Sequence, residues 1–314
     1  MHYGKNTRVI FTLLIIFFAT VFVVCGIMLI KSLNGYKEAT DLYDKVHQDF
    51  IDAIKPSDSN ENEVTGSSWQ RGEDTTELPP PEDTVPPETQ DPADTQAPED
   101  TEDDEPLETT PGYVAPVYSD KFNAARAQIW KLQDVNPDVI GYIYIEFSPT
   151  DVISYPLVQG DDNEYYVTHA YDKSSVRSGA IFLDCRNSFV LTENRASVIY
   201  GHNMNNGAMF NRLTNFKQSE HFRNTKITIY TINGIYIYEV FAAYNTTVSS
   251  NAAQIKFDSD EAFVNFCNEL EGRSIHNKNM EFYANDSILT LSTCLNTYDV
   301  ARFVVHGVLC GIEW

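Results

Sequence analysis

The chain has 314 residues, of which 42% are hydrophobic and 12% aromatic, enough apolar material for one or two folded domains. Its 45 acidic and 22 basic residues give a formal net charge of -23. This excess argues against nucleic acid as a partner, because phosphate binding needs a basic surface. Of the acidic residues, 18 lie between Pro56 and Gly112, where Arg71 is the single basic residue, so the remainder of the chain is only mildly acidic.

The first distinctive element is an uncharged apolar run of 22 residues, Val9–Ile30. At about 1.5 Å per residue, such a helix spans the roughly 30 Å hydrocarbon core of a bilayer. A cleaved signal peptide would have a shorter apolar region followed by a small-x-small cleavage site, and this sequence has neither. We therefore predict that residues 1–31 form a cytoplasmic tip and a single transmembrane anchor.

Two further segments precede the folded part. In residues 32–55, Tyr36, Tyr43, Val46, Phe50 and Ile54 recur at helical spacing, which predicts an amphipathic juxtamembrane helix that rests either on the membrane surface or on the folded domain. Residues 56–116 are acidic and rich in Pro and Thr, which predicts a disordered tether. Lysines on both sides of the apolar run leave its orientation open, but a long tether followed by a soluble domain favours an extracellular position for that domain.

Residues 117–314 form the predicted folded domain. Its first element is a helix over residues 120–135, which Asn136-Pro137 ends, and a second helix is expected over residues 258–270 with an Asp258…Glu261 capping box. Asn233-Gly234 predicts a hairpin turn with positive φ at both residues. Short segments rich in β-branched or aromatic residues predict strands at 139–145, 152–158, 179–183, 196–200, 226–232, 235–242, 287–293 and 302–311. Many short strands without a βαβ rhythm indicate a β-barrel or sandwich.

The cysteines suggest little cofactor chemistry. There are five, an odd number without CxxC spacing, which suits neither a disulfide framework nor a zinc site, and we expect no metal and no other cofactor. Cys25, Cys185, Cys267 and Cys310 lie in apolar, strand-like or helix-like surroundings, so we predict that they are buried structural thiols.

Three residues at junctions between strands and loops are candidates for catalysis. Cys294 ends a strand, where a thiol is accessible yet fixed in position, and His202 follows an apolar strand and a glycine. Arg302 opens the last strand, eight residues after Cys294, where a permanent cation could stabilise an oxyanion. Each has a simpler interpretation as well: a buried thiol, a hydrogen-bonded loop histidine and a salt-bridged surface arginine.

The motifs around these residues, taken in order, resemble those of the sortases. They are Tyr200-Gly-His-Asn-Met, Thr290-Leu-Ser-Thr-Cys294 and Arg302-Phe-Val-Val-His-Gly. Further strings look like class B sortases and extend the resemblance over nearly all of residues 117–314: Asn136-Pro-Asp-Val-Ile-Gly141, Ser154-Tyr-Pro-Leu-Val-Gln-Gly-Asp-Asp-Asn-Glu-Tyr-Tyr166 and Gly179-Ala-Ile-Phe-Leu-Asp184.

The resemblance implies a mostly β fold. This is a sortase-like eight-stranded β-barrel with an N-terminal helix and a helix inserted before the last strands, here behind a single transmembrane helix. It assigns the catalytic triad to His202, Cys294 and Arg302. Asn163, Tyr200 and Ser292 match class B residues that line the substrate groove or support the triad. His306 shares a strand face with Arg302, and we predict that it is a packed histidine.

The implied activity is that of a cysteine transpeptidase. The Cys294 thiolate would attack the threonine carbonyl in the C-terminal sorting signal of a secreted protein and form a thioester. An amine of peptidoglycan, or of its lipid-linked precursor, would then take over the acyl group. The alternatives are a hydrolytic cysteine peptidase, a pilin-polymerising sortase and an inactive anchored binding module.

Overall fold

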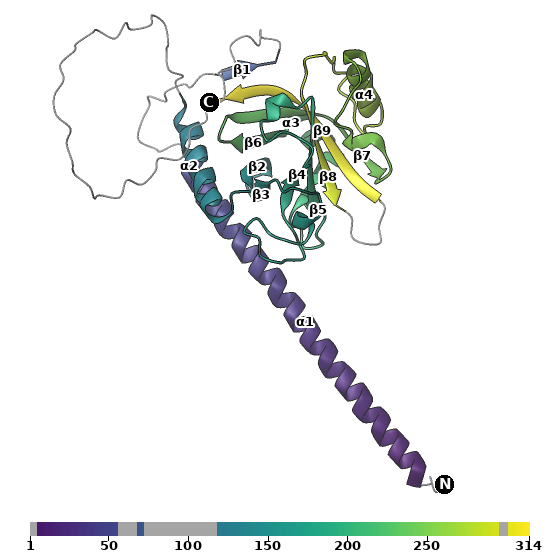
Figure 1. Ribbon diagram of the computed structural model, residues 1–314. Helices are drawn as coiled ribbons and strands as arrows, with labels where there is room; N and C mark the ends of the chain where they lie inside the picture. The colour runs from purple at the N-terminus through teal and green to yellow at the C-terminus, as the bar shows by residue number, and fades with distance from the viewer. Residues whose placement is uncertain (1–4, 56–67, 72–117, 295–300) are drawn as a thin grey trace, which may run out of the picture.

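The computed structural model describes residues 5–55, 68–71, 118–294 and 301–314, and its strands close into a barrel (Figure 1). The strands are β1 (Ser68–Gln70), β2 (Val139–Ser148), β3 (Asp151–Val158), β4 (Ile181–Leu183), β5 (Ala196–His202), β6 (Lys226–Thr231), β7 (Ile235–Thr247), β8 (Ile288–Cys294) and β9 (Ala301–Glu313). Neighbours pair in the order β9-β7-β6-β2-β3-β4-β5-β8, and β8 pairs back with β9. Within the described ranges, eight strands therefore form a closed barrel, and the predicted fold is confirmed.

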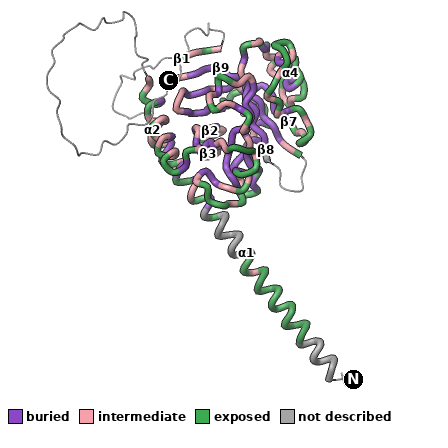
Figure 2. Tube along the Cα trace, viewed as in Figure 1, coloured by how far each residue is buried: buried purple, intermediate pink, exposed green. Residues whose placement is uncertain are grey.

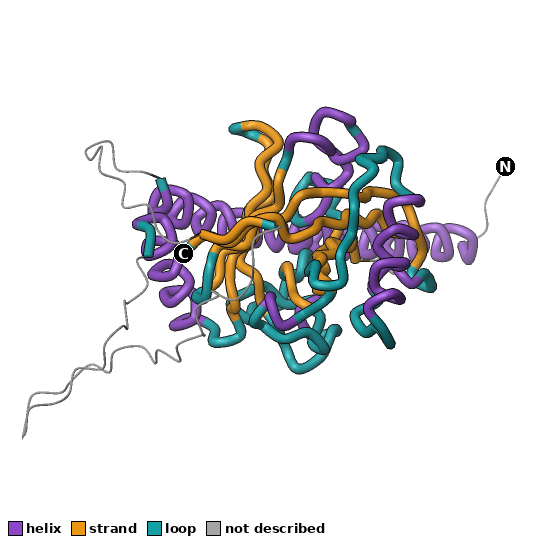
Figure 3. The backbone as a smooth tube through the Cα atoms, turned by 90° about the horizontal axis from the view of Figure 1, so that it is seen from above, coloured by secondary structure: helices purple, strands orange, loops and turns teal. Residues whose placement is uncertain are grey.

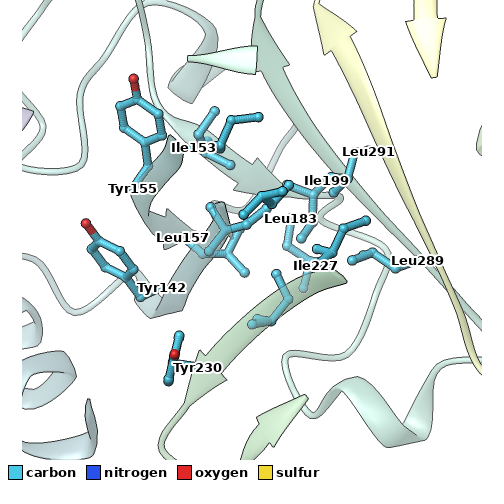
Figure 4. Packing of buried hydrophobic residues seen from close by; sticks show 14 of the residues in the cluster. Tyr142, Ile153, Tyr155, Leu157, Leu183, Ile199, Ile227, Tyr230, Leu289 and Leu291 are labelled. Atoms are coloured by element: carbon cyan, nitrogen blue, oxygen red, sulfur yellow. The ribbon is translucent and has the colours of Figure 1, made fainter. Parts of the chain in front are cut away.

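Apolar side chains from most of these strands fill the barrel. Figure 4 shows Leu157, Ile199 and Leu289, among others, converging from β3, β5 and β8, and all three are fully buried. Burial of this kind is the main stabilising contribution to the fold, at about 25 cal/mol per Å² of apolar surface. The tube in Figure 2 is accordingly buried along nearly every strand.

Helices surround the barrel, as the view from above shows (Figure 3). They are α1 (Lys5–Ile54), α2 (Asp120–Val135), α3 (Ser219–Asn224) and α4 (Asp260–Gly272), with 3-10 turns η2 (Tyr165–Val167), η3 (Leu191–Glu193), η4 (Phe210–Lys217) and η5 (Asn251–Ala253). The helix predicted at 120–135 has the expected bounds, and the Ser119 side chain caps its N-terminus. The predicted helix before the last strands is α4. Its cap is Ser259 rather than the Asp258…Glu261 box, because the Ser259 hydroxyl reaches the backbone N–H of Ala262.

Helix α1 is a single 50-residue helix, so the two predicted N-terminal segments are continuous with each other. It extends away from the barrel toward the N-terminus, and its other end lies against the barrel (Figure 1). There Phe50 stacks on Tyr142 with ring centroids 3.8 Å apart, so this part of the helix rests on the folded domain, one of the two predicted locations. In the part of the chain that the structure describes, no helix is both long and apolar enough to cross a membrane. The side chains of residues 9–12 and 29–30, at the two ends of the predicted span, lie outside the described ones.

Four residues of the predicted tether depart from the predicted disorder. Strand β1 pairs antiparallel with the end of β9, with Trp69 opposite Ile312. Next to it, Arg71 donates two hydrogen bonds to the buried carboxylate of Asp286. An aromatic residue and an arginine thus supply the contacts of this short stretch with the folded domain. The other tether residues, 56–67 and 72–116, lie outside the described part of the chain.

The hairpin between β6 and β7 forms where it was predicted, but with a different turn. The last pair of the ladder is Tyr230 with Ile235, and neither Asn233 nor Gly234 has a positive φ. The side chain of Thr231 closes the turn instead, because its hydroxyl accepts from the Asn233 N–H and donates to the Gly234 carbonyl. The predicted two-residue turn was therefore wrong, since these side-chain bonds stabilise a longer connection.

Candidate active site

The site lies where β5, β8 and β9 come together. Strands β5 and β8 run parallel in a continuous register of seven pairs, from Ala196 with Ile288 to His202 with Cys294. The two residues are thus backbone neighbours at the same end of two paired strands. Of Cys294 only the backbone is described, and residues 295–300 after it lie outside the described residues.

Strand β9 brings Arg302 to the same end. The β8–β9 pairs run from Ile288 with Val308 to Ser292 with Val304, and two further steps of this antiparallel register lead to Cys294 and Arg302. The Arg302 guanidinium donates a hydrogen bond to the carbonyl of Thr293, the residue before the cysteine. The three predicted catalytic residues are therefore brought together at one end of the barrel.

The surroundings of His202 fix the tautomer of its ring. It is only 7% exposed, and its Nε2 lies 2.8 Å from the Val167 carbonyl oxygen. Because a carbonyl can only accept, Nε2 carries the hydrogen, which leaves Nδ1 of the neutral ring as the basic nitrogen. Nδ1 is buried and has no hydrogen-bond partner among the described residues.

The surroundings of His202 lower its pKa. Burial is the largest cause, and the positive charges of Arg177 and Arg302 add to it, while the hydrogen bond to the Val167 carbonyl acts in the opposite direction. A lower pKa favours the neutral imidazole at physiological pH and makes the imidazolium, once formed, a stronger acid.

Steric crowding explains why a glycine precedes His202. A Cβ at Gly201 would touch the Ile181 side chain and lie 2.8 Å from the Phe210 ring. Only glycine therefore allows β5 to pass so close to β4 and η4 while it carries His202 to the strand end.

Two of the predicted groove residues share the sheet face of the site, and one of these two, Tyr200, also joins the third in a hydrogen-bond network. Tyr200 and Ser292 are paired across β5 and β8, one step of two residues before His202 and Cys294, so they share the sheet face of those residues. The Tyr200 hydroxyl donates to the buried carboxylate of Asp184, 3.0 Å away, and Asn163 Oδ1 accepts from the backbone N–H of Cys185. Asn163 and Tyr200 thus take part in a hydrogen-bond network around Asp184.

Asp184 is the centre of this network and was not predicted as a functional residue. Arg186 binds it through two nitrogens, and hydrogen bonds from Arg186, Asn163 and Tyr200 hold its pKa at about 2 despite the opposing effect of burial. It ends the string that runs from Gly179, but only the structure shows that the carboxylate points at Tyr200.

Cys267, Cys310 and His306 are unsuited to catalysis. Burial raises the pKa of Cys267 to about 12 and raises that of Cys310, so neither favours a thiolate. The prediction of four buried thiols holds for Cys267 alone, since Cys25 is exposed on α1 and Cys185 and Cys310 are partly exposed. His306 is fully buried, bonded to Thr290 and Tyr244, and burial lowers its pKa to about 3, so it is a packed histidine.

The structure is thus a closed β-barrel with His202, Cys294 and Arg302 at one end, and comparisons with known proteins identify its class. The chain matches the Sortase domain family over residues 156–310. It is 32% identical to sortase B of Listeria monocytogenes over 188 residues, which cover 59% of this chain and 74% of the relative.

Solved structures are similar as well. A Staphylococcus aureus sortase B–substrate complex aligns with a TM-score of 0.54 at 29% identity, covering 59% of this chain and 86% of that one. Sortase B from Bacillus anthracis in complex with AAEK1 aligns with a TM-score of 0.52 at 34% identity, covering 58% and 84%. The chain belongs to the sortase family, and it is a class B sortase, a cysteine transpeptidase.

The effect of the nearby arginines on the His202 pKa can be tested. Arg177 is exposed, and its charge lowers the pKa of His202, so Arg177→Met should raise that pKa. The measurement is an NMR titration of the His202 ring in the two proteins. Arg195→Met is the control, because Arg195 lies at the opposite end of β5 and pairs with Asp260. An unchanged or lower His202 pKa in Arg177→Met, or an equal rise in the control, would contradict the description.

Proposed function

We propose that Cys294 is the nucleophile of this transpeptidase, with His202 as acid–base group and Arg302 as oxyanion stabiliser. The observation that carries the proposal is the register of β5 and β8, in which His202 and Cys294 are direct partners. The hydrogen bond from Arg302 to the Thr293 carbonyl supports it, because it brings a cation to the residue next to the thiol.

The proposed reaction has two acyl transfers. The Cys294 sulfur attacks the threonine carbonyl carbon of a sorting signal, and its proton passes to the basic nitrogen of His202. The guanidinium of Arg302 offsets the charge on the tetrahedral oxygen. When the C–N bond breaks, the His202 imidazolium gives its proton to the leaving amine, and a thioester remains.

The second transfer returns the enzyme to its starting state. An incoming amine attacks the thioester carbonyl, and His202 takes the proton that the amine loses. As the C–S bond breaks, the sulfur leaves and takes this proton from His202, which restores the thiol and the neutral imidazole. In the family, surface proteins with sorting signals are the substrates and peptidoglycan is the acceptor. We extend both to this chain, with threonine as the cleavage position and the wall peptide or its lipid-linked precursor as the source of the amine.

Tyr200, Ser292 and Asn163 are proposed to border the substrate groove. Tyr200 and Ser292 lie on the same sheet face as His202 and Cys294, two residues further from the strand ends. The hydrogen bond from Tyr200 to Asp184 fixes its hydroxyl, so we expect its ring, rather than that hydroxyl, to face the substrate.

We also propose that residues 9–30 anchor the enzyme in the cell membrane, with the N-terminus cytoplasmic and the catalytic domain outside. The support is the apolar stem of α1, where Leu13, Phe18 and Phe22 are 60%, 65% and 80% exposed (Figure 2). An exposed apolar surface of this size is unfavourable in water and is covered in a bilayer.

The test of the catalytic proposal is the variant Cys294→Ala. We expect cleavage of a threonine-containing sorting peptide to fall on the order of 10³-fold or more, because no nucleophile remains. Product analysis by mass spectrometry in the presence of triglycine separates the alternatives. A peptide joined to triglycine indicates transpeptidation, a free acid indicates a peptidase, and no product from the unmodified enzyme indicates a binding module.

The matched control is Cys185→Ala, which removes a different, partly exposed thiol. It should leave turnover unchanged. Cleavage that survives in Cys294→Ala, or that is lost equally in Cys185→Ala, would exclude Cys294 as the nucleophile.

The anchor is tested by flotation with phospholipid vesicles. The full chain should float with the vesicles, and a chain that lacks residues 1–31 should stay in the dense fraction, because the apolar stem accounts for the affinity. Equal behaviour of the two chains would show that this segment is not the anchor.

A further inference from the structure

The docked end of α1 contacts the active-site side of the barrel through Tyr43. This side chain is 6% exposed, and its hydroxyl donates a hydrogen bond of 2.9 Å to the carbonyl of Gly179, 136 residues further along the chain. Its ring packs edge-on against Tyr155 at 5.2 Å. A residue of the N-terminal helix is therefore fixed to the segment that leads into β4.

Gly179 in turn lies against the backbone of η2. It has φ +57, and a Cβ there would be 2.5 Å from the carbonyl oxygen of Tyr166 and 2.6 Å from that of Val167. The next residue, Ala180, donates its N–H to the Tyr166 carbonyl at 2.9 Å. Gly179 therefore packs closely against the backbone of Tyr166 and Val167, with no room there for a side chain.

The Val167 carbonyl is the group that holds His202. It accepts the Nε2 hydrogen at 2.8 Å and so determines both the tautomer and the orientation of the ring. Three successive contacts, from Tyr43 to Gly179, from Gly179 to Val167 and from Val167 to His202, thus connect the N-terminal helix with the proposed acid–base group.

We propose that Tyr43 is a positioning residue for catalysis, which orients His202 through Gly179 and the Val167 carbonyl. The inference rests on the proposed role of His202. It means that α1 contributes to the geometry of the active site in addition to linking the catalytic domain to the N-terminal segment.

The hydroxyl of Tyr43 is the specific link. One side of the residue borders a cavity of about 160 Å³ between α1, Ser178 and residues 206–212, so packing encloses it incompletely. Ser178, next to Gly179, is buried with no hydrogen-bond partner for its hydroxyl among the described residues. The bond from Tyr43 therefore joins this segment to α1, while the Ala180 N–H joins it to η2.

The experiment is Tyr43→Phe in the full chain in detergent micelles, which keeps the ring and removes the hydroxyl with its hydrogen bonds to Gly179 and to the Tyr171 backbone. A lost hydrogen bond of ordinary strength corresponds to a decrease in kcat of roughly 2- to 10-fold, with KM unchanged because no substrate contact is altered. The hydrogen bond that His202 donates to the Val167 carbonyl raises the pKa of His202, so its loosening should lower that pKa and move the acid limb of the kcat profile to lower pH. The His202 ring resonance should show the same shift.

His47→Ala is the matched control. It lies one helical turn further along α1 and loses a similar hydrogen bond, of 2.6 Å to Ser154 on β3, but it does not touch the Gly179 segment. Ser154 keeps a partner in Tyr142. The control should leave kcat, the pH profile and the His202 resonance unchanged, although its stability falls by an amount similar to that of Tyr43→Phe.

The outcomes separate this inference from the proposed function. If Tyr43→Phe behaves like the control while His202→Asn abolishes turnover, His202 is catalytic and Tyr43 does not position it. If His202→Asn retains turnover, the proposed function itself fails. Equal changes in Tyr43→Phe and His47→Ala would show a general loosening of α1 and would overturn the inference.

Discussion

The pairing of β8 on both of its edges is the constraint on which the rest of the structure depends. One edge bonds in parallel to β5 over seven pairs, and the other bonds antiparallel to β9. Without the second set, the sheet would remain open and Arg302 would have no fixed relation to Cys294. Because the register of a paired strand cannot slip by one residue without inverting its buried face, the positions of all three candidate residues follow from the closed barrel.

The surroundings of His202 set the electrostatics of the site. The ring is buried, and the charges of Arg177 and Arg302 lower its pKa further. A histidine with a lowered pKa releases its proton readily, which is what protonation of a leaving amine requires. The backbone carbonyl of Val167 accepts the other ring hydrogen and leaves a defined nitrogen for proton transfer.

Much of the barrel could be predicted from the sequence, because its strands are rich in β-branched and aromatic residues and are separated by clear loops. The helix at 120–135 was predicted with its observed bounds, since apolar spacing and Asn136-Pro137 define it. The order of the motifs identified the three candidate residues, which the structure brings together. What failed were local details that depend on a single side chain, such as the hydroxyl of Thr231 that closes the hairpin.

Other features had no signature that a sequence could show. A backbone carbonyl such as that of Val167 carries no information in the identity of its residue. The network around Asp184 and the contact of Tyr43 with Gly179 join segments far apart in the chain, so they become visible only once the barrel is closed. Strand β1 is three residues long within an acidic segment, and its pairing comes from an open edge of β9 rather than from its own propensity.

The most direct test of the central claim is to trap the acyl-enzyme. The unmodified protein is mixed with a threonine-containing sorting peptide without an added amine, quenched in acid and digested for mass spectrometry. The proposed mechanism predicts that the acyl part of the peptide is attached to the fragment that contains Cys294, and that hydroxylamine removes it, as expected for a thioester. Attachment to another cysteine, or cleavage of the peptide with no covalent intermediate at any time point, would contradict it.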